Sequence, residues 1–138
     1  MVQDEIPVFR DAGHFYYPTL YFEHQQWQQG QVPLWNPQDE LGRPFAADAS
    51  AGVFYPGKLI FMFPFAFSTC LVLYTALHLL VAAYTTFRVA RYLKATALAS
   101  IIAAISFSLG GAVLSQHANI IFLVSAAWLP LALLYGLQ

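Results

Sequence analysis

The sequence has little charge and a single cysteine. Only 9% of its 138 residues are charged, while 59% are hydrophobic and 17% aromatic; an ordinary soluble domain has about 25% charged residues. A chain of this length buries only about two thirds of its surface, so this apolar excess would lie exposed in water. The lone Cys70 excludes an intramolecular disulfide and argues against a cysteine-based zinc site. The composition therefore argues against both a soluble globular protein and a disordered chain.

Acidic residues are absent from the second half of the chain. All seven lie within residues 1–58, which carry a net charge of −4, and residues 59–138 carry +3 from Arg88, Arg91 and Lys94. The whole chain has a net charge of −1, so no basic field attracts polyanions and we expect no nucleic-acid partner. A Gly-rich phosphate loop is also absent, which argues against a nucleotide substrate.

Long uncharged runs fill the second half. Twenty-nine residues separate Lys58 from Arg88, and 44 follow Lys94. A helix that spans a bilayer needs about 20 apolar residues. We therefore predict an all-α integral membrane protein, with residues 1–58 as one part and residues 59–138 as the membrane part. About three transmembrane helices are expected, over residues 65–87, 97–115 and 120–137.

Prolines and polar residues limit these spans. Pro64 separates a short interfacial piece, residues 59–63, from the first span. Polar residues at 116–119 divide the second span from the third, which Pro130 should kink. The alternative is a soluble protein with three buried core helices. Such helices need polar faces, and residues 97–115 offer only scattered serines, so membrane insertion is preferred.

The basic residues predict the orientation in the membrane. Arg88, Arg91 and Lys94 lie in the short link between the first two spans, and short basic links stay on the cytoplasmic side. Residues 1–58 and the break around His117 then lie together outside the cytoplasm.

The first part is rich in aromatic residues, which a disordered linker would lack. Pro18 can begin a helix and Gly30 can end it. Apolar positions recur within it at spacings of three and four, whereas Glu23 falls on the polar side. We expect this helix to lie along the membrane surface with Trp27 at the headgroups. Prolines and glycines then follow every few residues, which predicts an ordered loop of turns without strands.

Several segments carry a family resemblance. Residues 29–37 read QGQVPLWNP and resemble the GExPLWNP signature of YfhO-like bacterial membrane proteins, which belong to the GT-C superfamily of membrane glycosyltransferases. Further matching segments, in the same order, are Arg10-Asp11, FYYP at 15–18, LGRPF at 41–45, SAGVFYP at 50–56, QHAN at 116–119 and AWLP at 127–130.

The chain departs from this family in places. Gln31 replaces the family's glutamate, Arg43 replaces its second glycine, and Gly57-Lys58 replaces the usual asparagine. Members of the family also have a span before the first outer loop and many more spans after it. The resemblance therefore implies an N-terminal fragment, whose activity alone is an open question.

The resemblance implies a reaction and a location. Enzymes of this superfamily transfer a sugar from a polyprenyl-phosphate donor to an acceptor outside the cytoplasmic (inner) membrane, here a component of the bacterial cell envelope. An acidic residue in the first outer loop serves the acceptor, often with a divalent metal ion. Asp11 stands at the matching position.

The residues around Asp11 suit such chemistry. Sugar transfer with inversion needs a carboxylate base near the acceptor oxygen and positive charge near the leaving phosphate. His14 follows Asp11 at i+3, and Arg10 offers two parallel donors to a phosphate. The competing interpretation is that Asp11 caps the helix that follows.

Further substrate-binding candidates are weighed in the same way. Trp35 stacks on a sugar or builds a turn with Asn36, whose side chain bonds the neighbouring backbone. Asp48 is the best second carboxylate, although solvent exposure is its default. The remaining candidates, with Arg10 and His14, are Tyr17 and His117. Two histidines are a weak metal signal.

Two other functions stay open beside the glycosyltransferase. One is a non-catalytic membrane transport or assembly component, and the other is an accessory peptide of a larger complex. The ordered aromatic loop favours sugar transfer, because a simple anchor does not need it.

Overall fold

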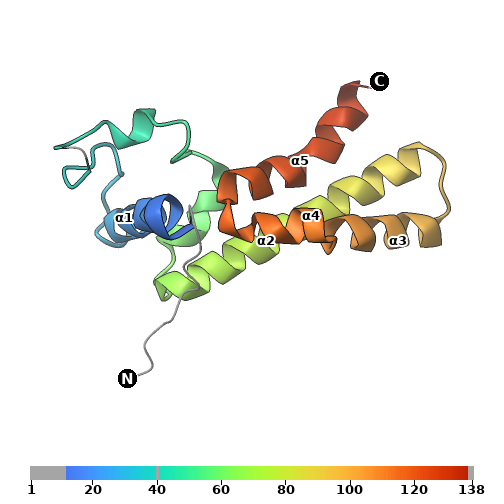
Figure 1. Cartoon of the computed structure of the whole chain (residues 1–138), viewed down its shortest axis with the longest axis horizontal. Coiled ribbons are helices and arrows are strands. Elements are labelled where there is room, and N and C mark those ends of the chain that lie inside the picture. Colours follow the sequence, from blue (N-terminus) through green and yellow to red (C-terminus); the bar gives the residue numbers. More distant parts are fainter. Residues whose placement is uncertain (1–11, 40, 137–138) are drawn as a thin grey trace. The chain divides into compact units, whose positions relative to one another are not determined.

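The computed structural model describes residues 12–39 and 41–136, and the fold of this part is all-α (Figure 1). Within these residues no strand forms, and a single antiparallel bridge joins Asn36 to Arg43. The chain divides into two compact units, residues 1–74 and 75–138, and the division falls within helix α2. The predicted fold class is confirmed.

Helix α1, Tyr17–Gln28, follows a π-helical turn at Ala12–Tyr16. Pro18 lies in its first turn, where a missing N–H costs nothing. Just past the helix, Gly30 adopts φ +70°, the left-handed conformation that favours glycine. Both predicted helix boundaries are confirmed to within one or two residues.

The core of the first unit lies between α1 and the loop that follows it. Phe22 packs edge-on against Phe45 with ring centroids 5.0 Å apart, and Ala51 and Val53 complete the cluster. Trp27 packs against this cluster. Trp27 is therefore partly buried against the protein's own core, and its contact with lipid headgroups stays a prediction.

A second 3-10 helix in this unit, η3, spans Pro56–Met62, after the shorter η2 at Phe45–Ala47. It includes most of the predicted short piece at residues 59–63, and Phe61 is fully buried in it. Pro64 then separates η3 from α2, as the sequence predicts.

Helix α2, Phe67–Tyr92, runs further than the predicted span. It continues through Arg88 and Arg91 because basic side chains stabilise the negative end of the helix dipole. Lys94 adopts φ +63°, and the next amide, of Ala95, donates to the carbonyl of Ala90 at 3.0 Å. This pattern closes the helix as a Schellman motif with lysine at the position usually held by glycine.

The next apolar stretch is interrupted. Helix α3, Ala97–Ser108, is capped by the Thr96 hydroxyl, which accepts from the amide of Ala99 at 3.3 Å. It ends before Leu109–Gly110, and α4 (Gly111–Leu114) and the 3-10 helix η4 (Ser115–Ala118) follow. The predicted span over 97–115 falls within Ala97–Ala118, which is long and apolar enough to cross a membrane, and its helix is interrupted near the two glycines at 110–111.

Helix α5, Ile120–Gly136, matches the third predicted span in the described residues and contains Pro130. It changes direction along its length (Figure 1), as a helix with an internal proline does. The hydroxyl of Thr85 in α2 donates to the carbonyl of Ala127 in α5 at 2.8 Å, which ties these helices together inside the second unit.

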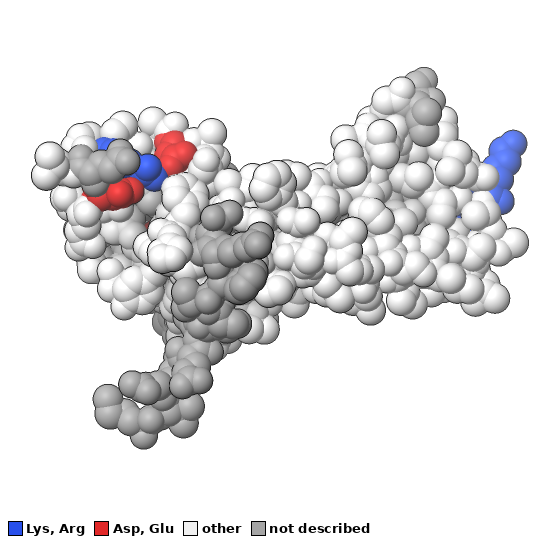
Figure 2. Space-filling model, viewed as in Figure 1, with Lys and Arg blue, Asp and Glu red and all other residues white. Residues whose placement is uncertain are grey.

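Two stretches, α2 and Ala97–Ala118, are long and apolar enough to cross a membrane, and α5 is shorter. Large apolar side chains such as Leu80, Leu98 and Ile102 lie exposed on them. In Figure 2 the visible described residues of the second unit are uncharged (white) apart from basic side chains (blue) at one end. A soluble protein rarely exposes so much apolar surface, so the soluble alternative is disfavoured.

Candidate functional site

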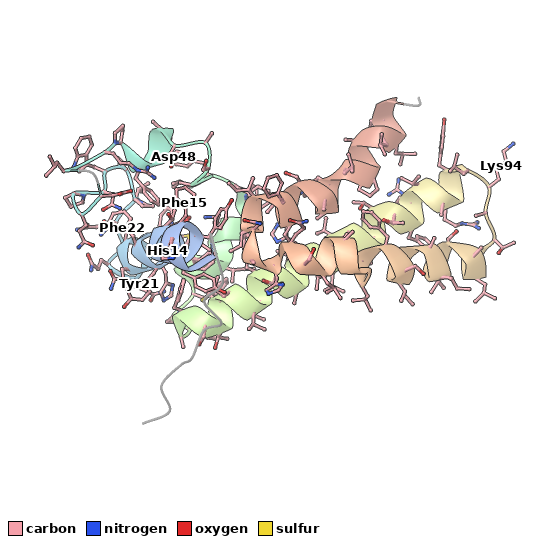
Figure 3. All side chains as sticks on the ribbon, viewed as in Figure 1. His14, Phe15, Tyr21, Phe22, Asp48 and Lys94 are labelled. Carbon is pink, nitrogen blue, oxygen red and sulfur yellow. The ribbon has the colours of Figure 1, made fainter. Side chains whose placement is uncertain are left out.

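The predicted catalytic residue Asp11 and its neighbour Arg10 lie outside the described residues. Of their predicted companions, His14 is exposed in the π-helical turn before α1 (Figure 3). Tyr17 begins α1 and is half-buried, which raises the pKa of its hydroxyl above the usual value. Of the residues predicted to form the site around Asp11, the structure therefore describes His14 and Tyr17.

The loop after α1 is held by its own backbone and by Asn36. The amides and carbonyls of Asn36 and Arg43 exchange two hydrogen bonds of 3.0 Å. The side-chain oxygen of Asn36 accepts from the amide of Gln38 at 3.0 Å, which is the predicted turn. The bridge joins the segment LWNP to the segment LGRPF, so two of the family-like motifs form one structure.

Trp35, in the first of these segments, packs against Gly42 in the second. Gly42 has φ +106°, and a Cβ built there would lie 2.8 Å from Cζ2 of the Trp35 ring. The indole thus lies against a position where only glycine fits, yet 55% of the residue remains exposed. A large aromatic surface therefore packs on one side against Gly42 and stays open to solvent.

Arg43 lies between two carboxylates of the loop, those of Asp39 and Asp48. Its Nη2 donates to Oδ2 of Asp48 at 2.6 Å, and its Nε lies 3.1 Å from Oδ2 of Asp39 without hydrogen-bond geometry. The other oxygen of Asp48 accepts from the amide of Ser50 at 2.8 Å. The expectation that Asp48 simply faces solvent is therefore wrong. Both oxygens are engaged, and the residue that departs from the family pattern, Arg43, engages one of them.

A buried ion pair lies between α1 and η3. The Nζ of Lys58 donates to Oε2 of Glu23 at 2.5 Å and to the carbonyl of Ala51 at 2.9 Å. Glu23 is 0% exposed and Lys58 6%. The placement of Glu23 on a polar outer side of α1 is thus wrong. Phe61 lies beside the ammonium, 5.7 Å from ring centroid to Nζ, and adds a cation–π contact.

Burial acts on both members of this pair. Loss of solvation raises the pKa of Glu23 and lowers the pKa of Lys58, and the attraction between the two charges opposes both shifts. Sequence reasoning missed this pair because 35 residues separate its members. The one signal in the sequence is Lys58 itself, a cation beside a long apolar run.

The last predicted residue, His117, lies in the second unit. It is exposed in η4, and its Nδ1 lies 2.8 Å from the carbonyl of Leu114. In the part of the chain that the structure describes, no three His, Cys, Asp or Glu side chains gather closely enough to hold a metal ion. Metal binding therefore stays a prediction.

Within the described part, Trp35, Asn36 and Asp48 are brought together through Gly42 and Arg43. This loop presents to solvent the ring of Trp35 and, beside it, the partly exposed ion pair of Arg43 with Asp48. Comparison of the chain with protein-family models, with curated proteins and with solved structures finds no match.

Proposed function

We propose that this chain forms the outer loop and first helices of a multi-pass glycosyltransferase in the inner membrane of a bacterium. The enzyme takes a sugar from a polyprenyl-phosphate donor and transfers it to an acceptor in the cell envelope. Support comes from the family-like motifs and from α2 and Ala97–Ala118, which have the length and composition of membrane spans.

The observation that carries the proposal is the open ring of Trp35, which packs on one side against Gly42. Sugars present a face of C–H groups that packs against aromatic rings. Trp35 and Asn36 belong to one family-like motif, and Gly42 belongs to another. The loop therefore has the form of a sugar-recognition surface rather than of a plain tether.

In this proposal Asp11 supplies the chemistry. Its carboxylate accepts the proton of the acceptor hydroxyl while the donor phosphate leaves, and Arg10 and His14 offer hydrogen bonds to that phosphate. A divalent metal ion at Asp11 would stabilise the same leaving group. Trp35, Asn36 and Tyr17 would then orient the sugar.

The test measures sugar transfer in membrane vesicles that contain the longest natural protein with this sequence. Asp11→Asn should lower the rate by a factor of about 10²–10⁴, the usual cost of losing a general base. Its abundance in the membrane should not change, because asparagine still caps a helix. If Asp11 is instead only a cap, Asn will be active and Asp11→Ala will reduce abundance.

Variants of the loop test the sugar surface separately. Trp35→Ala should weaken donor or acceptor binding, and Trp35→Phe should restore part of it because a ring remains. Leu34→Ala is the matched control, because Leu34 is adjacent to Trp35 in sequence and is exposed to a similar extent. Equal effects of Trp35→Ala and Leu34→Ala, together with an active Asp11→Asn protein, would favour a non-catalytic transport or assembly component.

A further inference from the structure

A series of large apolar side chains lies exposed between the polar loop and α2. Leu59 is 58%, Met62 47% and Phe63 54% exposed, and Phe65 follows them. The rings of Phe63 and Phe65 stack with centroids 5.9 Å apart. These four residues, called the η3 patch below, run directly into α2, which begins at Phe67. Large apolar side chains exposed so close together along the chain are typical of an interaction surface.

Within residues 12–39 and 41–136, the charged residue next to the η3 patch in sequence is turned away from it. Lys58 lies next to Leu59 in sequence, yet its ammonium is buried against Glu23 and the carbonyl of Ala51. The patch therefore presents no charge of its own to the surroundings. An apolar phase would not have to desolvate an ion in order to receive it.

The backbone beneath the patch is also satisfied from inside. The end of a helix leaves carbonyls without partners, and hydrocarbon offers none. Here the Nε2 of Gln28 donates to the carbonyls of Phe63 at 2.7 Å and Phe61 at 3.3 Å. The Nδ1 of His24 lies 3.0 Å from the carbonyl of Phe61, to which it donates in the Nδ1–H tautomer. Side chains of α1 thus provide the donors that water would otherwise supply.

We propose that the η3 patch is the membrane-interface anchor of the first unit and that the acyl chains of lipids cover it. Three observations agree: the exposed side chains are apolar, the nearby charge is neutralised internally, and the carbonyls are bonded. The patch is continuous with a helix that has the length and composition of a membrane span. Helix α1 then lies on the water side of η3 as its supplier of hydrogen bonds, and does not itself enter the lipid. This proposal rests on the membrane placement of α2 and is independent of sugar transfer.

Spin labels in vesicles of phosphatidylcholine and phosphatidylglycerol test this arrangement. The background is Cys70→Ser, which keeps a donor for the carbonyl of Ile60 that Cys70 contacts at 3.5 Å. A label at Met62→Cys should collide readily with oxygen and lose its collisions with a water-soluble nickel chelate. A label at Gln25→Cys, on the exposed side of α1, should show the reverse. Leu59→Cys provides a second position in the patch should the Met62 variant fail to insert.

The outcomes separate the possibilities. Labels in the patch that are as open to the nickel chelate as the label at Gln25 would overturn the proposal. Shielding at Gln25 with exposure at Met62 would make α1 the anchor instead. A label at Leu80→Cys, exposed on α2, reports on the span itself. If the label at Leu80 is also accessible to the nickel chelate, the membrane placement of α2 is wrong. If all labels behave as expected but the protein transfers no sugar, only the proposed activity is overturned.

Discussion

Removal of the Lys58 charge should increase the fraction of molecules in which the first unit is open. In Lys58→Met the carboxylate of Glu23 stays fully buried and keeps only a 3.5 Å contact with the indole Nε1 of Trp27. Breaking a buried ion pair by deleting one partner costs about 3–5 kcal/mol, because the remaining charge has lost both water and partner. The opening equilibrium should therefore rise by a factor of a hundred or more, since about 1.4 kcal/mol is tenfold.

Native-state proteolysis measures this opening in detergent. Chymotrypsin can cut at Phe45 only after the core opens, because that side chain is 1% exposed. When opening and closing are fast, the cleavage rate follows the open population. The double variant Glu23→Gln with Lys58→Met should cost much less than the sum of the single changes, since no buried charge remains.

The control is a more exposed ion pair. Asp39→Asn removes a partner of Arg43 whose side chain is 44% exposed, and this change should cost less than about 1 kcal/mol. If Lys58→Met changes cleavage at Phe45 no more than Asp39→Asn does, or if the two single changes add, the buried pair does not hold the loop onto α1.

Two further predictions concern topology and pH. A cysteine at Gln38 should react with an impermeant reagent added outside cells and one at Leu93 should not; both side chains are exposed, so the reverse result would invert the orientation. Because burial raises the pKa of Glu23, the folded unit binds more protons at this residue than the unfolded chain does at any pH between the two pKa values. Lowering the pH from about 7 toward about 5 should therefore increase the free energy of unfolding relative to the double variant Glu23→Gln with Lys58→Met, in which neither buried group titrates, and an unchanged or decreasing difference would refute this assignment.

The sequence predicts a structural element correctly where the residues that cause it lie within a few positions of one another. Pro18 and Gly30 limit α1 through their own backbone preferences, and Asn36 forms its turn with an amide two residues away. The length of uncharged sequence is likewise a direct property of the chain, which is why α2 and α5 were predictable.

The candidate site depended on distant partners, and there prediction failed. Residue type alone assigns Glu23 to solvent, whereas its burial follows from Lys58, on another helix. Asp48 is engaged by Arg43 because the bridge to Asn36 turns the chain back. The sequence predicts that the first span ends just before the first basic residue, Arg88. Helix α2 instead continues to Tyr92, because the capping hydrogen bonds and not the first basic residue set the end of a helix.

The connection between α2 and α3 has a consequence for biogenesis. Only residues 93–96 join them, and the Schellman closure at Lys94 and the Thr96 cap fix both ends of this link. In a membrane, so short a link cannot let one helix cross fully while the other waits in water. The two helices would then insert together as one hairpin, and the basic turn between them would stay on the side from which insertion begins.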